Sequence, residues 1–193
     1  MEPSIDVTNS VYEPAEDTYL LAKYAKDLKG IIIEIGIGSG YVSLVNAKSN
    51  PQNKVFGVDL NPEAVENAKH NAIKNNISNV NFFVSDLFSS VRGMFDAIVF
   101  NPPYLPTEKK ERVKGELNRA FDGGKDGRKI LDVFLAGFGK HLKTKGTLLL
   151  VHSSLNNQDK TISILKNKGF KVEILEERSF FFEKLLLLKA ARK

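Results

Sequence analysis

The sequence of 193 residues contains no cysteine, and histidine occurs only three times. Without cysteine the chain can form no disulfide bond, no cysteine-ligated metal site and no thiol nucleophile. The three histidines, His70, His141 and His152, lie far apart in the sequence. We therefore expect no zinc site and no other metal centre in this protein.

Long hydrophobic runs are also absent. No apolar run approaches the ~20 residues needed to cross a bilayer, and the N-terminus has no signal-peptide pattern. A hydrophobic content of 42% with 26% charged residues is typical of a soluble globular protein. We expect a cytoplasmic protein with a single domain over residues 1–193, in which residues 1–10 form a loosely ordered arm.

Charge of one sign is only in mild excess, with 28 basic and 23 acidic residues and a formal net charge of +5. This balance is compatible with an RNA- or ribosome-associated partner. Much of the excess, however, is lysine on expected helix faces and in the tail 189–193. We expect a solvated surface rather than a dedicated nucleic-acid face.

The most informative stretch is FDAIVFNPPY, residues 95–104. Its apolar part is long enough for one buried strand and too short for a helix. The strand must stop at Asn101, because Pro102 and Pro103 have no N–H to donate to a sheet and fix their own φ. The sequence predicts a rigid corner at the carboxyl end of a strand, where ligands bind in open α/β sheets.

The residues of this corner suit transfer of a group to a planar nitrogen. The NH2 of a carboxamide or aromatic amine is a poor nucleophile, but it has two hydrogens that acceptors can hold. The side-chain oxygen of Asn101 is one acceptor, and the Pro102 carbonyl is a candidate second. Tyr104 is placed to stack on or enclose the flat group. The alternative is a plain strand followed by a proline turn, with Asn101 as a turn former.

A second motif is the glycine-rich turn GIGSG, residues 36–40, between an expected strand at 31–35 and a helix at 41–48. Such a turn is typical of a nucleotide-type cradle, in which glycines let backbone N–H groups approach a ligand. It is not the dinucleotide fingerprint, because the third glycine would fall at Tyr41. Glu34 at the end of the strand would repel a pyrophosphate and suits a cationic ligand.

Two more expected strands end in an acid. The strand 54–59 ends at Asp59, where βαβ nucleotide sites place a carboxylate that accepts hydrogen bonds from ribose hydroxyls. The strand 79–86 ends at Asp86, which is placed to bind an exocyclic amine such as that of adenine, with Leu87 or Phe88 beside the ring. Either acid alone is equally well explained as a strand-end turn or helix cap, but three such acids favour a ligand site.

The remaining pattern alternates strands and helices. Further strands are expected at 145–151, 171–175 and 183–188, and amphipathic helices from residue 129 and over 157–168. No helix separates the last two strands, so we expect them to be antiparallel. The glycine-rich end of the segment 105–128, just after the corner, predicts a flap or substrate-side wall.

These elements resemble the α/β, Rossmann-like fold of the S-adenosylmethionine-dependent methyltransferases, a seven-stranded sheet in the order 3-2-1-4-5-7-6 with the last strand antiparallel. The acid and glycines of 34–40, Asp59, Asp86 and the sequence NPPY are similar to successive motifs of that fold. The chain is most similar to the HemK/PrmC-like class and, within it, to the small archaeal–eukaryotic branch. That branch lacks the N-terminal helical domain of the bacterial enzymes, as we expect for this chain. Residues 12–18 and 123–128 extend the resemblance over about residues 11–188.

The resemblance implies S-adenosyl-L-methionine as cofactor and N5-methylation of the glutamine in the Gly-Gly-Gln loop of a class-1 translation release factor. Implied catalytic residues are Asn101, Pro102, Pro103 and Tyr104. Implied cofactor contacts are Thr18, Glu34, Gly36, Gly38, Gly40, Asp59, Leu60, Asp86, Leu87 and Asn101. Eukaryotic relatives work with a small zinc-binding activator protein that pairs along the third strand, here residues 79–86, where Phe83 breaks the apolar alternation.

Other functions remain open from the sequence. The same fold also methylates adenine N6 in DNA or RNA, although base flipping usually needs an added recognition domain. A protein lysine is a further possible acceptor. A catalytically silent, cofactor-binding scaffold is the alternative from another class, and it would have no use for an intact NPPY sequence.

Overall fold

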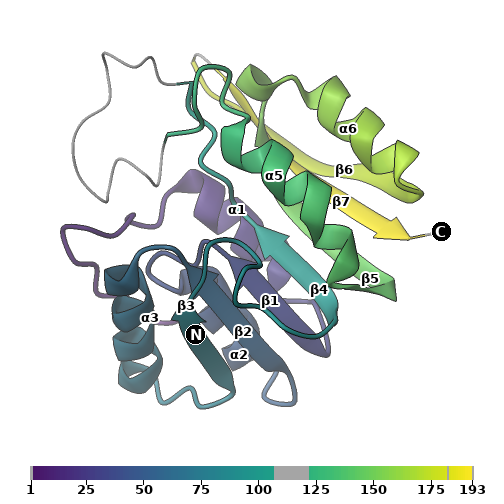
Figure 1. Cartoon of the computed structure of the whole chain (residues 1–193). Helices are drawn as coiled ribbons and strands as arrows, with labels where there is room; N and C mark the ends of the chain where they lie inside the picture. Colours follow the sequence, from purple (N-terminus) through teal and green to yellow (C-terminus); the bar gives the residue numbers. More distant parts are fainter. Residues whose placement is uncertain (1, 107–121, 182, 193) are drawn as a thin grey trace.

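The computed structural model describes residues 2–106, 122–181 and 183–192. The described chain is built on one seven-stranded sheet in the order β3-β2-β1-β4-β5-β7-β6 (Figure 1). The strands are β1 (Ile31–Ile35), β2 (Lys54–Asp59), β3 (Val80–Val84), β4 (Phe95–Phe100), β5 (Leu142–Ser153), β6 (Phe170–Ser179) and β7 (Lys184–Arg192). Neighbouring strands are parallel except that β7 is antiparallel to both β5 and β6. This confirms the predicted sheet order and the antiparallel last strand.

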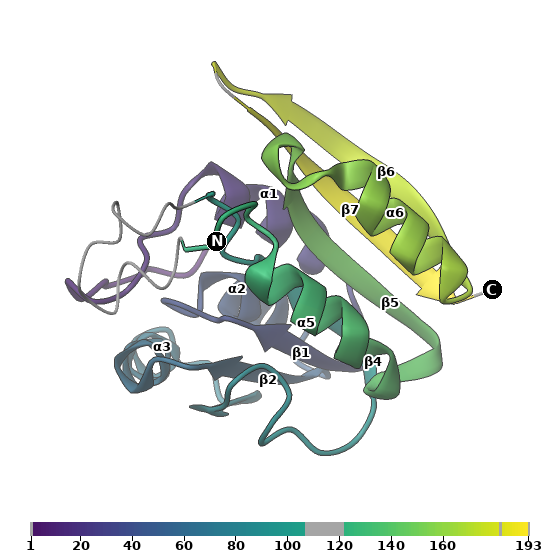
Figure 2. The same ribbon diagram turned by 45° about the horizontal axis from the view of Figure 1, so that its top comes forward.

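Helices cover both faces of the sheet. They are α1 (Glu16–Ala25), α2 (Tyr41–Ser49), α3 (Pro62–Lys74), α5 (Lys129–Gly137) and α6 (Gln158–Asn167), with short 3-10 turns at Phe138–Lys140 and Ser154–Asn156. Figure 1 shows α5 and α6 over the near face, with α1 and α2 behind, and Figure 2 shows the same layers from another angle. The apolar residues divide accordingly into one core under α5 and α6, a second under α1 and α2, and a third that includes residues of α2, α3 and β3.

The sequence of the central strands explains this layering. β1 reads IIIEI and β4 reads FDAIVF, and each is buried along nearly its whole length because helices cover both faces. β1 pairs with β2 on one side and with β4 on the other. The chain order therefore reverses between β1 and β4, and ligands bind at the carboxyl ends of strands at such a switch point.

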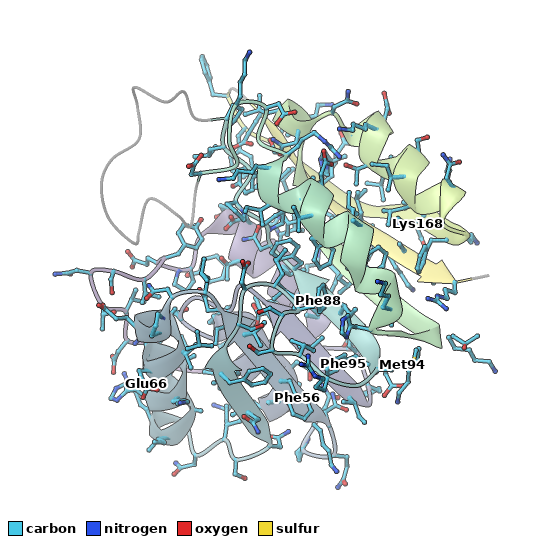
Figure 3. All side chains as sticks on the ribbon, in the orientation of Figure 1. Phe56, Glu66, Phe88, Met94, Phe95 and Lys168 are labelled. Carbon is cyan, nitrogen blue, oxygen red and sulfur yellow. The ribbon has the colours of Figure 1, made fainter. Side chains whose placement is uncertain are left out.

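An aromatic cluster fixes the connection between β3 and β4. Figure 3 labels Phe56 and Phe95 on the sheet and Phe88 beside α5. The rings of Phe56 and Phe95 are 5.9 Å apart, and Phe88 stacks on Phe134 at 5.6 Å and on His141 at 4.6 Å. Burial of such rings, with favourable ring–ring geometry, anchors the loop that carries Asp86 and Leu87.

The N-terminal segment differs from the expected loose arm. It has no helix or strand, but three asparagines spaced four residues apart hold it: Asn67 and Asn71 of α3, and Asn75 just after that helix. Asn75 exchanges two hydrogen bonds with the backbone of Ser4, at 2.7 and 2.9 Å, and Asn71 exchanges two with the backbone of Asp6, both at 2.9 Å. The arm is ordered because side-chain amides replace the backbone partners it would have in a sheet.

Several element boundaries also differ from the prediction. β3 ends at Val84, which puts Asp86 two residues beyond the strand. β6 continues to Ser179 and β7 to Arg192. Asn61 caps α3, accepting a hydrogen bond from the Glu63 N–H at 3.0 Å.

Candidate active site

A cavity of about 320 Å³ lies at the carboxyl ends of β1, β2 and β4. Its walls come from five segments that are far apart in the sequence. They are residues 10–18, the end of β1 with the glycine turn, the end of β2 with the start of α3, the loop after β3, and the corner 101–105. Asp122, Lys129 and Ile130 complete the lining. The volume fits a small-molecule ligand.

The corner after β4 forms one wall, as predicted. Asn101, Pro102, Pro103 and Tyr104 all line the cavity. The Asn101 side-chain NH2 donates a hydrogen bond to Asp17 Oδ2 at 3.0 Å, and the Tyr104 hydroxyl donates to the same oxygen at 3.2 Å. Asp17 is only 3% exposed. The corner is therefore fixed from the side of α1 by a buried carboxylate.

The other end of the Asn101 amide is unpaired. Its Oδ1 is buried and accepts no hydrogen bond within the described structure. An acceptor left in this state costs about 1–3 kcal/mol, and such a group calls for an explanation. Asn67 and Asn156 also have an unpaired Oδ1, but neither residue lines the cavity. Only for Asn101, among these three, does the unpaired acceptor belong to a cavity wall.

Two tyrosines share the Asp17 carboxylate. The Tyr12 hydroxyl donates to Asp17 Oδ1 at 3.0 Å and also lies 3.2 Å from Oδ2, the oxygen that Tyr104 contacts. Burial, reinforced by the neighbouring Asp17 charge, raises the pKa of both Tyr12 and Tyr104. Both hydroxyls thus stay protonated and act as donors to Asp17 at neutral pH.

The glycine turn lines the cavity through Gly36, Ile37, Gly38 and Ser39. Its N–H groups are used within the protein, contrary to the expectation that they approach a ligand. Those of Gly36 and Ile37 donate to the Val58 carbonyl at 2.8 and 3.1 Å, and that of Gly38 donates to Asp59 Oδ2 at 3.0 Å. The turn therefore lacks the convergent N–H groups of a phosphate cradle.

Gly40 is not among the residues that line the cavity, contrary to its implied role as a cofactor contact. It has a positive φ of 83° at the start of α2. A Cβ at this position would lie 2.9 Å from the Ala68 Cβ of α3. Glycine is required here for close packing of the turn against α3 and for the left-handed backbone.

Glu34 lies in the cavity wall and is 4% exposed. Its Oε2 accepts hydrogen bonds from the Ser43 hydroxyl and from the Ser43 N–H, the latter at 2.9 Å. Burial raises its pKa to about 8, and the Ser43 contacts offset only part of that effect. The side chain is therefore largely protonated at pH 7, and a bound cation would favour its ionised form.

Asp59 both supports the glycine turn and lines the cavity. Its oxygens accept the N–H groups of Gly38 at 3.0 Å and Asn61 at 2.9 Å, so it holds the glycine turn against the start of α3. It also lines the cavity beside Leu60, which is 50% exposed. Burial raises the Asp59 pKa, and the backbone hydrogen bonds oppose the shift.

The loop after β3 supplies Asp86 and Leu87, and both line the cavity. The Asp86 side chain is exposed, whereas Leu87 is half-buried against the core beneath α5. Leu87 has a positive φ of 46°, which is uncommon for a residue other than glycine. The turn that presents these two side chains is held by Ser85, whose hydroxyl donates to the Leu87 carbonyl at 2.9 Å.

The polar groups that line the cavity fit S-adenosylmethionine better than a pyrophosphate-containing nucleotide. Three carboxyl groups, those of Glu34, Asp59 and Asp86, face a cavity that also has apolar walls. A cationic ligand with ribose hydroxyls and an amine-bearing ring matches these acceptors, while a phosphate would meet carboxylates and no free N–H nest. Thr18, also implied as a cofactor contact, lines the same cavity.

Asp17 and Tyr12 were not singled out as site residues from the sequence, although both lie in the segment 12–18. Asp17 follows Glu16 at the start of a helix, where acids are expected for the helix dipole alone. The distinguishing signal is burial, which a first-turn position does not reveal. Of the expected flap, residues 107–121 lie outside the described structure. Leu105 and Asp122, on either side of them, line the cavity, whereas Arg128 is buried and pairs with Asp132.

Other site types have no support among the described residues. No group of three or more His, Asp or Glu side chains there could hold a metal ion. None of the described helices is long and apolar enough to cross a membrane.

Comparison with known proteins agrees with this geometry. Residues 15–182 match the family model of the methyltransferase small domain. The chain is 50% identical to MJ0928 of Methanocaldococcus jannaschii, whose assigned activity is protein N5-glutamine methylation, over 94% of this chain and 92% of that protein. It is 34% identical to the human methyltransferase HEMK2, over 94% of this chain and 89% of that protein.

A solved structure shows the same architecture. The E. cuniculi Mtq2–Trm112 complex, responsible for methylation of the translation termination factor eRF1, superposes with a TM-score of 0.74 at 28% identity. The match covers 95% of this chain and 99% of that one. The resemblance drawn from the sequence motifs is thereby confirmed: the chain belongs to the methyltransferase small domain family and, within it, to the HemK-like N5-glutamine methyltransferases.

Proposed function

We propose that this protein binds S-adenosyl-L-methionine in the cavity and methylates the side-chain nitrogen of a glutamine in a class-1 translation release factor. The observation that carries the proposal is the Asn101 amide. Its nitrogen is bonded to Asp17, and its oxygen is a buried, unpaired acceptor in the wall of a ligand-sized cavity. An acceptor of this kind suits a donor that arrives with the substrate.

Different residues around the cavity would bind different parts of the cofactor. Asp59 would accept hydrogen bonds from the ribose hydroxyls, and Asp86 with Leu87 and Leu60 would hold the adenine end. Glu34 and Thr18, which line the same cavity, would face the cationic end. When bound, the cofactor supplies an electrophilic methyl group on a sulfonium. Gly36 and Gly38 leave room because they have no side chains in the wall.

The corner residues act on the methyl acceptor. A glutamine NH2 has a delocalised lone pair, and accepting its hydrogens favours the pyramidal nitrogen that forms as the new bond develops. Asn101 Oδ1 would accept one hydrogen and the Pro102 carbonyl the other, while Tyr104 encloses the planar group. The rate enhancement then comes mainly from placement and from acceptors matched to the developing positive charge.

The choice of a release factor is supported by the relatives. MJ0928 and the eRF1-methylating Mtq2–Trm112 complex cover nearly the same length as this chain. Release factors act in the cytoplasm, where we place this protein. An adenine amine is also planar and has two hydrogens, so methylation of nucleic acid is the competing outcome of the test below.

We also propose that a small zinc-binding activator protein pairs along residues 79–86. β3 is the edge strand of the sheet, and Val84 on it is 45% exposed. An edge strand with exposed apolar side chains is a template for a partner strand. Phe83 is half-buried against the core, so it stabilises the fold and is not offered to a partner at this edge.

The decisive assay incubates the protein with methyl-labelled cofactor and purified release factor, with and without the activator. Mass spectrometry then locates the label, and a release factor with Gln replaced by Ala in the Gly-Gly-Gln loop is the control. We expect label on that glutamine only, and a higher rate with the activator. Label on nucleic acid, or on the control release factor, would overturn the substrate assignment.

A further inference from the structure

The Asp17 carboxylate joins three parts of the site: α1, the segment before it and the corner after β4. Oδ1 accepts the Thr18 N–H at 2.6 Å and the Tyr12 hydroxyl at 3.0 Å. Oδ2 accepts the Asn101 side-chain NH2 at 3.0 Å and the Tyr104 hydroxyl at 3.2 Å. The Thr18 hydroxyl is a fifth donor, to Oδ1 at 3.2 Å, and the Tyr12 hydroxyl also lies 3.2 Å from Oδ2. All five donors are neutral. A buried carboxylate that collects this many donors is satisfied without a cation, and each donor is oriented by it.

The contact with Asn101 has a chemical consequence. A carboxylate can only accept hydrogen bonds, whereas an amide side chain has a donor end and an acceptor end of nearly the same shape. Asp17 therefore selects one of the two orientations of the Asn101 amide, with the nitrogen inward and the oxygen away from Asp17. We propose that Asp17 is a positioning residue that makes Asn101 an acceptor, and not a donor, towards the substrate. The inference rests on the proposed transfer to a planar NH2.

The isosteric variant Asp17→Asn tests this directly. The Thr18 N–H belongs to the backbone and cannot turn, so the remaining oxygen of residue 17 is needed there. The new NH2 of residue 17 then faces Asn101, and the two amides are compatible only if Asn101 turns by about 180°. Asn101 would present its own NH2 to the substrate NH2, two donors facing each other. The tyrosine hydroxyls can rotate to accept instead.

We expect Asp17→Asn to lower kcat by about a hundredfold, as does loss of one preorganised hydrogen bond, while affinity for S-adenosylhomocysteine changes less than about threefold. The rescue is the double variant Asp17→Asn with Asn101→Asp, which has the same composition as the native protein. Its carboxylate at position 101 accepts from residue 17 and keeps a second oxygen for the substrate. We expect it to recover at least about tenfold in kcat over Asp17→Asn.

A second readout is independent of turnover. Hydrogen exchange of the Asn101 side-chain NH2, followed by NMR, is expected to be slow in the native protein, because this group is bonded to buried Asp17, and faster in Asp17→Asn. Native kcat in Asp17→Asn, no recovery in the double variant, or fast exchange in the native protein would each overturn the inference. Should the native enzyme label no glutamine, the proposed function fails, while the exchange measurement still decides the role of Asp17.

Discussion

Two buried polar clusters lie side by side at the carboxyl edge of the sheet and serve different ends. The Asp17 cluster consists of Tyr12, Asp17, Thr18, Asn101 and Tyr104. The Arg128 cluster consists of Arg128, Asp132, His152, Asn156 and Thr161. They meet where the Asn156 NH2 donates to the Tyr104 carbonyl at 2.7 Å. Every member of the first cluster lines the cavity, and no member of the second does.

The Arg128 cluster satisfies its own charges. Arg128 is 2% exposed and donates to the Asn156 carbonyl, to Thr161 Oγ1 at 2.8 Å and to Asp132 at 2.6 Å. Burial lowers the His152 pKa to about 4, so this side chain is neutral and pairs with Thr161 at 2.9 Å. Burial of polar groups therefore does not identify a site. The difference is whether an unsatisfied atom belongs to a wall that a ligand can reach.

The largest effect is expected for Asn101→Ala. Removing the acceptor should lower kcat on the order of a hundredfold, about 3 kcal/mol, with cofactor affinity retained. Steady-state kinetics and calorimetry separate the two quantities. Asn67→Ala is the matched control, because Asn67 is also buried with an unpaired Oδ1 but lies outside the cavity. Equal loss of turnover and cofactor affinity in Asn101→Ala would mean that Asn101 is structural.

Arg128→Ala should show the opposite behaviour. We expect the free energy of unfolding to fall by about 2–3 kcal/mol, because buried carbonyls lose their donor, while Asp132 keeps its ion pair with Lys160 at 2.9 Å. Denaturant unfolding measures this, with exposed Lys166→Ala as control. If kcat collapsed while stability was unchanged, the division between the two clusters would be wrong.

Asp59→Ala should weaken binding of S-adenosylhomocysteine by about 10- to 100-fold, since charge-assisted hydrogen bonds contribute about 1.5–3 kcal/mol. Part of the loss is expected to come from the glycine turn, which Asp59 holds through Gly38. Titration calorimetry gives the affinity, and exposed Asp27→Ala is the control. Unchanged affinity would remove Asp59 from the site.

The smallest effect, taken per pH unit, concerns the dependence of stability on pH. The pKa of Glu34 is about 8 in the folded protein against an ordinary value of 4.5. Between these values the folded protein holds a proton that the unfolded chain has lost, so stability falls as pH rises, by at most about 1.4 kcal/mol per pH unit. Glu34→Gln should remove this slope. Unfolding measured at several pH values tests it, and Glu66, on the outer surface of α3 (Figure 3), provides the control Glu66→Gln. Parallel pH curves for the native protein and Glu34→Gln would contradict the assignment.

The sheet could be predicted from the sequence because its central strands are short apolar runs bounded by glycine, proline or acids. The ends of β6 and β7 could not. The last residues of β6 are charged and polar, and Glu176 and Arg178 pair with Lys23 and Glu16 of α1. β7 ends in Lys-Ala-Ala-Arg, where two alanines give only a weak strand signal. Ion pairs across an edge strand replace the apolar alternation on which the prediction depends.

The site was predicted in part for a similar reason. Residues that follow a strand, such as Asn101 and Asp59, are placed by the topology of a parallel sheet. Asp17 reaches the cavity from a helix packed on one face, and nothing in its local sequence encodes that approach. The N–H groups of the glycine turn were misjudged because their acceptors, Val58 and Asp59, belong to the neighbouring strand.

Asn67, Asn71 and Asn75 can pair with only a short stretch of the N-terminal arm. Four helical residues advance ~6.0 Å, whereas two extended residues advance ~6.8 Å. Successive asparagines of the helix therefore fall progressively out of register with the residues of the extended arm. Asn75 and Asn71 each pair with one residue of the arm. Asn67 instead donates to the Asp6 carbonyl at 3.0 Å, which Asn71 already binds, and the Asn67 Oδ1 remains without a partner. The chain then turns at Thr8, and Ser10 meets the start of α3 through the Glu63 side chain and the Asn61 NH2, the latter at 3.1 Å. The arm is thus fastened at both ends of α3 before residues 10–12 form part of the cavity wall.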